Sequence, residues 1–300
     1  MNSEIAFTPC LPSGACANLA QSVAVSGSLD AICGTVNTLD VVEKRMAEKM
    51  DTHEVVGWLR SALHGYRLEP VGMLTETREL DSPVYAADFL ALRIQLEERG
   101  VLFPLPSESA SFANVVEESV AGVVLREAAQ KGVRVVRGKD RGYPDLEFLP
   151  STRSGEVFAV DIKVARKKRY RRAPKDGGST ESRITLYTGN TYFRYPKIKF
   201  DLSLRPFAEY SGHISIIVLY TLDEGSLSRS RDFEVCIHPT WMPASTKVSS
   251  TTRVYIGAVK KLDNIRRRLG EFETEEAFYK FWRDYPFPVP READRKLKST

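Results

Sequence analysis

The spacing of apolar residues predicts helices in the first third of the chain. Apolar positions recur at helical spacing from Leu39, and Asp51 followed by Glu54 forms a capping-box pattern that opens a second helix running through Leu63. These two helices form either a small helix-turn-helix or a helical pair packed on the main domain, because both arrangements use amphipathic helices. A further helix is predicted over 89–99, closed by a glycine.

A long helix is predicted over Ser111 to Lys131, with Gly132 as its stop. Its apolar face consists of Val116, Val120, Val123 and Val124. Short β-rich runs follow, separated by polar or Gly-containing turns, at 133–136, 146–149, 157–164, 184–187, 213–221, 233–238 and 254–259. A last helix over 274–285 is ended by three prolines. The elements together predict an α+β or mixed α/β fold.

The composition suits a globular catalytic domain with an appendage. Residues 1–36 are rich in Ala, Ser and Gly with little periodicity, which predicts a flexible arm. A net charge of +4 is only mildly basic, so it permits a polyanionic partner without requiring one. No run of about 20 apolar residues is present and the start lacks a signal-peptide pattern, so we expect a cytoplasmic protein with no membrane partner.

The cysteines and histidines lack the spacing of a zinc site or of a nucleophile with its base. We expect reduced thiols, and structural or surface roles for the imidazoles. The residues are Cys10, Cys16, Cys33, Cys236, His53, His64, His213 and His238.

Two carboxylates and a lysine carry the candidate chemistry. Asp145 follows a proline, and Asp161 and Lys163 lie at the end of an apolar strand with Ile162 between them. Alternate residues of a strand share a face, so Asp161 and Lys163 project together. If Asp145 lies on an adjacent strand, the pair supplies oxygen ligands of the kind that Mg²⁺ selects, beside a cation. The pattern is equally compatible with Asp145 capping a turn and a solvated ion pair on an edge strand.

Several ordered motifs resemble the EcoRV restriction endonuclease family, within the PD-(D/E)xK nuclease superfamily. They are Tyr143-Pro144-Asp145, Ala159 to Lys163, Ile184 to Leu186 with Gly189 to Phe193, Ile256-Gly257, Glu276 to Phe278 and Phe281 to Tyr285. The resemblance implies a restriction-endonuclease-like core, with a central mixed β-sheet flanked by helices. It gives three regions: the arm at 1–36, a helical extension at 37–81 and the endonuclease domain at 82–300.

The resemblance implies that Asp145 and Asp161 bind Mg²⁺, with the carbonyl of Ile162 as a further ligand, and that Lys163 is the catalytic lysine. The family also places a glutamate on the long helix. Counting back from the glycine that ends the helix puts Glu117 at that position, and a slip of one residue would exchange it with Glu118. The reaction implied is magnesium-dependent hydrolysis of phosphodiester bonds by a type II restriction endonuclease.

DNA contacts are expected from three segments. A basic run after the active-site strand suits phosphate binding, although such a run can also be a solvated surface: Arg166, Lys167, Lys168, Arg169, Arg171 and Arg172. A polar loop at 245–253, matching by resemblance the base-reading loop of the family, contains Lys247, Ser249, Ser250, Thr251, Thr252 and Arg253. This loop lacks the family's glycine, and an ordinary polar hairpin connection has a similar composition. Lys139 and Arg141 precede Asp145 in the third segment.

The partners implied are double-stranded DNA and a second copy of the chain, since a twofold dimer matches a palindromic site. The resemblance adds 5′-phosphate, blunt-ended products and a cognate DNA methyltransferase in the same system, without direct contact. The alternatives are a PD-(D/E)xK nuclease of repair or mobile-element processing, and a DNA-binding protein without catalysis.

Overall fold

The structure is a computed structural model, and it describes residues 5–6, 50–68, 85–87, 89–99, 105–106, 108–139, 142–150, 155–172, 174, 177–187, 191–223, 229–248, 256–287, 289 and 291–299. The chain divides into two units: residues 1–47 with 73–104, and residues 48–72 with 105–300. In the first unit, strand β1 (Ile5–Ala6) pairs antiparallel with β2 (Tyr85–Ala86), and α3 (Phe89–Glu98) confirms the predicted helix. The rest of the expected arm and the predicted helix from Leu39 lie outside the described residues.

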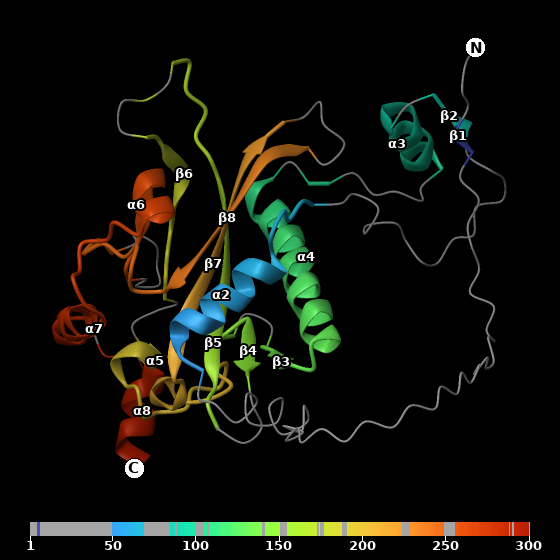
Figure 1. The fold of residues 1–300 in the computed structure, drawn as a ribbon. Coiled ribbons are helices and arrows are strands. Elements are labelled where there is room, and N and C mark those ends of the chain that lie inside the picture. Colours follow the sequence, from blue (N-terminus) through green and yellow to red (C-terminus); the bar gives the residue numbers. More distant parts are fainter. Residues whose placement is uncertain are drawn as a thin grey trace, which may run out of the picture. The chain divides into compact units, whose positions relative to one another are not determined.

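A five-stranded mixed sheet organises the second unit (Figure 1). Its strands are β3 (Arg134–Arg137), β4 (Leu146–Leu149), β5 (Phe158–Arg166), β7 (Gly212–Leu222) and β8 (Ser230–Pro239), which lie in the order β3-β4-β5-β7-β8. Only β5 and β7 are parallel; the other neighbours are antiparallel. β6 (Ser179–Ile184) and β9 (Val259–Lys261) form a separate antiparallel pair. The predicted mixed α/β fold with a central mixed sheet is confirmed.

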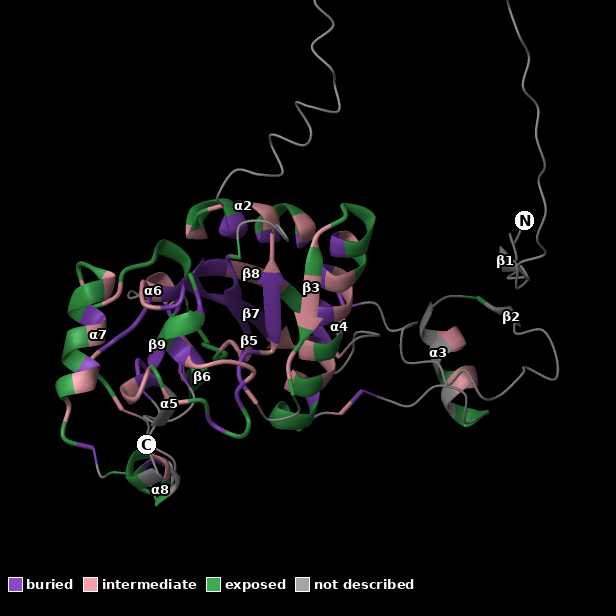
Figure 2. Ribbon diagram, turned by 90° about the horizontal axis from the view of Figure 1, so that it is seen from below, coloured by how far each residue is buried: buried purple, intermediate pink, exposed green. Residues whose placement is uncertain are grey.

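Helices α2 (Thr52–Ala62) and α4 (Ser109–Gln130) cover one face of this sheet (Figures 1 and 2). Trp58 of α2 packs edge-on against Phe148 of β4 with ring centroids 4.9 Å apart, and Phe112 of α4 packs on Tyr220 of β7 at 4.6 Å. The predicted apolar face of α4 is buried at Val116, Val120 and Val124, whereas Val123 is only half-buried. α2 therefore packs on the sheet, whereas the helix predicted before it lies outside the described residues, so the arrangement of the pair stays a prediction.

An aromatic core fills the opposite face, where α5 (Thr191–Arg194), α6 (Leu262–Arg267) and α7 (Glu275–Asp284) lie. Phe278 and Trp282 of α7 are fully buried against it. Phe207, in a short 3₁₀ helix at Phe207–Glu209, stacks on His213 of β7 with ring centroids 3.8 Å apart. His213 and His238 are buried and His53 and His64 are exposed, so the histidines have structural or surface positions.

Some of the predicted element boundaries are confirmed, and others differ. The capping box between Asp51 and Glu54 is confirmed, as is the positive φ of Gly132 that ends α4. A strand was predicted over 184–187, but β6 ends at Ile184. After it, Tyr187 makes an isolated bridge to Ile256. The helices α6 and α8 (Arg291–Ser299) were not predicted. The prolines after α7 do end that helix, but a proline directly before a new helix is also compatible with its first turn.

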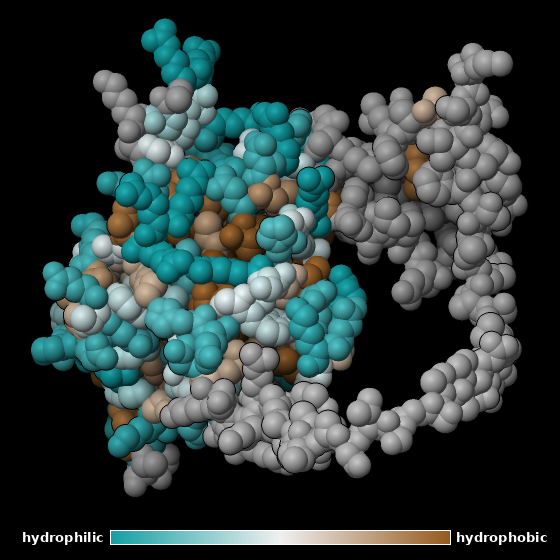
Figure 3. Space-filling model, viewed as in Figure 1, coloured by the Kyte–Doolittle hydropathy of each residue, from teal (hydrophilic) through white to brown (hydrophobic). Residues whose placement is uncertain are grey.

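The surface of the described residues is mainly hydrophilic on the face shown in Figure 3, with hydrophobic side chains visible between the polar ones. Within this described part, no helix has both the length and the apolar character required to cross a membrane.

Candidate active site

The side chain of Asp145 contacts β5 just beyond the last residue of β5 that pairs with β4. β4 pairs with β5 only as far as Val160, so Ile162 has no strand partner from β4. The carboxylate of Asp145 takes that place: its Oδ2 accepts a hydrogen bond from Ile162 N–H at 2.5 Å. The Gly138 N–H also donates to the carbonyl of Asp145 at 2.7 Å. The carboxylate of Asp145 is therefore held against the strand that carries Asp161, and its backbone is held by the residue that follows β3.

Asp161 and Lys163 lie on one face of β5, as the strand alternation predicts. Asp161 is 3% exposed, and Lys163 Nζ lies 2.6 Å from its Oδ2. Burial raises the pKa of Asp161 above its ordinary value, and the nearby Asp145 charge adds to the effect while Lys163 opposes it. Burial alone would lower the pKa of Lys163, but Asp161 and Asp145 more than offset it, so the ammonium keeps its proton.

Glu117 on α4 is half-buried beside this group. Burial, followed by the charge of Asp145, raises the pKa of Glu117 to about 7. Its neighbour Glu118 is exposed and pairs instead with Arg137 of β3. Of the two adjacent glutamates, Glu117 is therefore the one whose electrostatic environment includes Asp145 and Lys163.

The donor set fits a hard divalent cation. Asp145 and Asp161 bring two carboxylates together, and the ammonium of Lys163 lies 2.6 Å from Asp161 Oδ2. A cation between them would relieve their repulsion. No group of three or more His, Cys, Asp and Glu side chains in the described ranges is arranged to hold a metal. Asp145 and Asp161 are thus the carboxylates in this group that could hold a metal ion, and oxygen ligands of this kind suit Mg²⁺.

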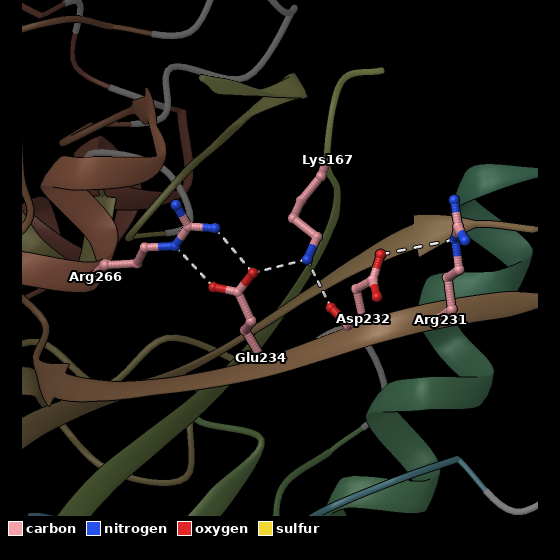
Figure 4. A network of polar contacts seen from close by, with 5 residues as sticks. All are labelled: Lys167, Arg231, Asp232, Glu234 and Arg266. Atoms are coloured by element: carbon pink, nitrogen blue, oxygen red, sulfur yellow. Dashed lines mark hydrogen bonds and ion pairs between the residues drawn. The ribbon is translucent and has the colours of Figure 1, made fainter. Parts of the chain in front are cut away.

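Much of the basic run is tied into the fold. β5 extends to Arg166, whose guanidinium pairs with Glu181 of β6 at 2.5 Å. Lys167 donates to Glu234 of β8 at 2.7 Å, and Arg266 of α6 forms a two-bond pair with the same carboxylate (Figure 4). Arg169 donates to the carbonyl of Leu222. These three side chains of the run thus make contacts within the fold.

The remaining predicted DNA contacts divide into exposed side chains and undescribed ones. Lys168 lies over the ring of Tyr170 at 5.6 Å, and Arg171 and Arg172 are exposed. Lys139 is exposed and donates to the carbonyl of Asp201, and Lys247 is exposed at the start of the predicted base-reading loop. Arg141, Ser249, Ser250, Thr251, Thr252 and Arg253 lie outside the described residues.

Two buried polar groups near the site were not predicted. The Tyr143 hydroxyl and His213 Nδ1 lie 2.7 Å apart, which ties the segment before Asp145 to β7. Beyond Asp145, the buried Glu147 accepts two hydrogen bonds from Arg205 and one from the Tyr210 hydroxyl. Tyr143 and Glu147 are separated from their partners by 58 to 70 residues in the sequence, so no local pattern indicates these hydrogen bonds.

A sequence model for the restriction endonuclease EcoRV matches residues 86–299. The chain belongs to the EcoRV restriction endonuclease family. As an EcoRV-family protein it is a nuclease that acts on double-stranded DNA, and the resemblance found in its motifs is confirmed. Asp145, Asp161 and Lys163 all fall inside the matched segment. No curated protein sequence matches the chain.

Proposed function

We propose that this chain is a Mg²⁺-dependent type II restriction endonuclease that cuts both strands of DNA at a short palindromic sequence. It acts as a homodimer in the cytoplasm and leaves 5′-phosphates and blunt ends. Family membership supports the nuclease activity. Metal dependence is proposed from the site, the homodimer from the symmetry of a palindromic substrate, and the blunt 5′-phosphate ends from the resemblance to EcoRV.

The observation that carries the proposal is the contact between Asp145 Oδ2 and Ile162 N–H at 2.5 Å. It brings a carboxylate from outside the strand to the unpaired edge of β5, where Asp161 and Lys163 already project. A structural ion pair on an edge strand would need only Asp161 and Lys163. A second, half-buried carboxylate beside them raises the electrostatic cost, and such an arrangement is typical of a functional site.

Asp145, Asp161 and the carbonyl of Ile162 would hold the metal ion. A bound Mg²⁺ supplies a more acidic water and compensates charge that develops on the phosphate. The protonated Lys163 donates to an oxygen of the scissile phosphate, where a fixed cation stabilises the transition state more than the ground state. Glu117, whose pKa lies at about 7, holds or accepts a proton next to the attacking water.

Two copies of the chain related by a twofold axis would each cut one strand, because a twofold protein matches a palindromic sequence. Bases are read by the loop at 245–253, and phosphates are held by the exposed members of the basic run and by Lys139 and Arg141. A methyltransferase with the same sequence specificity is expected in the host, where it protects the host DNA without touching this protein.

The test is digestion of a large sequenced phage DNA by the purified protein with Mg²⁺ and, in parallel, with EDTA. Discrete fragments that run-off sequencing maps to one palindrome, with blunt 5′-phosphate ends, are expected. Smeared products would instead support a nuclease of repair or mobile elements, and uncut DNA with retained binding would support a non-catalytic protein.

Matched variants tie cleavage to the site. Asp161→Asn removes the negative charge of the buried Asp161 carboxylate and should abolish cutting. Asp284→Asn removes a charge from an exposed pair with Lys280 on α7 and should leave cutting unchanged. Equal activity of both variants would refute the assignment of Asp161.

A further inference from the structure

A polar cavity lies beside the stretch of β5 that has no strand partner from β4. β4 leaves β5 after Val160, and β6 first meets β5 at the bridge from Lys167 to Thr180. Between these points the cavity has a volume of about 210 Å³. Its walls are residues 163–166 of β5, residues 181–185 of β6 and its end, and Ser109 at the start of α4.

The cavity walls carry three cations and one carboxylate. Lys163, Arg166 and Arg183 provide the positive charge, and Glu181 provides the negative charge. Arg166 is held by Glu181 at 2.5 Å. Arg183 is exposed, and its guanidinium makes one long contact of 3.3 Å to the carbonyl of Val248. Lys163 pairs with Asp161 and Arg166 with Glu181, so Arg183 is the wall cation that has no carboxylate partner among the described residues and can attract an anion.

Neutral hydrogen-bond donors line the same space. The hydroxyl-bearing residues are Ser109, Ser182 and Thr185. The backbone of β5 adds to them: Lys167 N–H donates toward β7, to Tyr220 O, while Lys168 N–H donates the other way, to Ser179 O. Because strand N–H groups alternate in direction, Val164 N–H points to the same edge as Ile162 N–H, where β4 is absent.

We propose that this cavity binds one phosphate of the DNA backbone, next to the phosphate that is cut, and that Arg183 and Arg166 are its cationic ligands. The Glu181 carboxylate lies against Arg166, at the place where that phosphate would bind. The inference rests on the proposed function, because the neighbouring phosphate reaches the cavity only when the scissile phosphate lies at Lys163.

The chemistry of the walls favours a phosphodiester over other anions. A guanidinium presents paired donors that match two oxygens of a phosphate, and hydroxyl and backbone N–H donors are common additional ligands. Arg166 already contacts the carboxylate of Glu181, with Nε and Nη2 both 2.5 Å from Oε2. A phosphate that enters must displace this carboxylate, so Glu181 lowers the affinity of the cavity for DNA.

Two substitutions in the cavity should therefore act in opposite directions. Arg183→Ala should raise the Kd for duplex DNA on the order of tenfold, as expected for one charged hydrogen-bonded contact, and should reduce the salt slope of binding by about one unit. Glu181→Gln should lower the Kd by about two- to fivefold, because an exposed competing ion pair is lost. If these residues served only to stabilise the fold, neither variant would bind more tightly.

The experiment scans single methylphosphonate substitutions through a duplex containing the mapped cleavage site, with Ca²⁺ in place of Mg²⁺ so that binding is measured apart from cutting. With the unmodified protein, neutralising one phosphate beside the scissile one should weaken binding. Arg183→Ala should be insensitive to that same substitution, because the contact is already absent. Arg267→Ala, an exposed arginine of α6 outside the cavity, is the matched control.

The outcomes separate this inference from the proposed function. Coupling of Arg183 to one neighbouring phosphate, together with tighter binding by Glu181→Gln, supports the cavity as a phosphate site. Site-specific cutting by the unmodified protein with no such coupling, or with weaker binding by Glu181→Gln, overturns the cavity assignment and leaves the proposed function standing. Failure of the unmodified protein to cut any DNA overturns the proposed function.

Discussion

Replacement of His213 by glutamine should remove a pH-dependent part of the free energy of unfolding. His213 is 3% exposed, and its Nδ1 lies 2.7 Å from the Tyr143 hydroxyl. Burial lowers the pKa of His213 from 6.5 to about 3. The unfolded chain therefore binds a proton below pH 6.5 that the folded chain does not, and stability is lost as the pH falls through that value.

The magnitude follows from the two pKa values. Between about pH 7 and about pH 5 the folded imidazole of His213 stays neutral, so the loss depends almost entirely on the titration of the unfolded chain. Linkage then gives a decrease of about 2 kcal/mol in the free energy of unfolding. The glutamine variant lacks this contribution, although it shares every other titrating group with the unmodified protein.

Urea denaturation followed by tryptophan fluorescence measures the effect at both pH values. The stability difference between the unmodified protein and His213→Gln should shrink by about 2 kcal/mol on acidification. The same substitution at His64, an exposed residue after α2, serves as the control. A difference for His213→Gln that stays constant between the two pH values would refute the description of His213 as a buried neutral imidazole.

Three further predictions concern the site and its support. Lys163→Ala should lower the single-turnover cleavage rate by roughly 100- to 1,000-fold while the Kd for DNA, measured in Ca²⁺, changes much less; equal losses in both would contradict a transition-state role. Arg205→Met leaves the buried Glu147 without the partner that donates two hydrogen bonds to it. Urea titration should show a free energy of unfolding lower by about 2 to 3 kcal/mol. An unchanged midpoint would show that this pair does not contribute to stability. Asp51→Ala removes the side chain that accepts from Glu54 N–H at 2.9 Å, and calorimetry should show a loss of about 1 kcal/mol, whereas Glu54→Gln should retain most of the stability.

Local patterns predicted the elements that depend on local physics. The capping box at Asp51 and the stop of α4 at Gly132 need only neighbouring residues, and both are confirmed. α8 was missed because its sequence is strongly polar and follows prolines, so its pattern indicates a tail. Its position is instead maintained by contacts with distant residues, among them the bond from Lys296 to Asp201 at 2.8 Å.

The family and the candidate site could be read from local pattern alone: two carboxylates and a lysine at the alternation of a strand, within motifs of the EcoRV family. Which cationic side chains of the basic run form ion pairs within the fold depends on the tertiary structure. Nothing in the local sequence distinguishes Arg166 and Lys167 from Arg171 and Arg172 as members of one basic run. The first two nevertheless form ion pairs with carboxylates on β6 and β8. Those carboxylates lie 15 and 67 residues away. Strand alternation is a local property, whereas the pairing of charges depends on which strands the fold brings together.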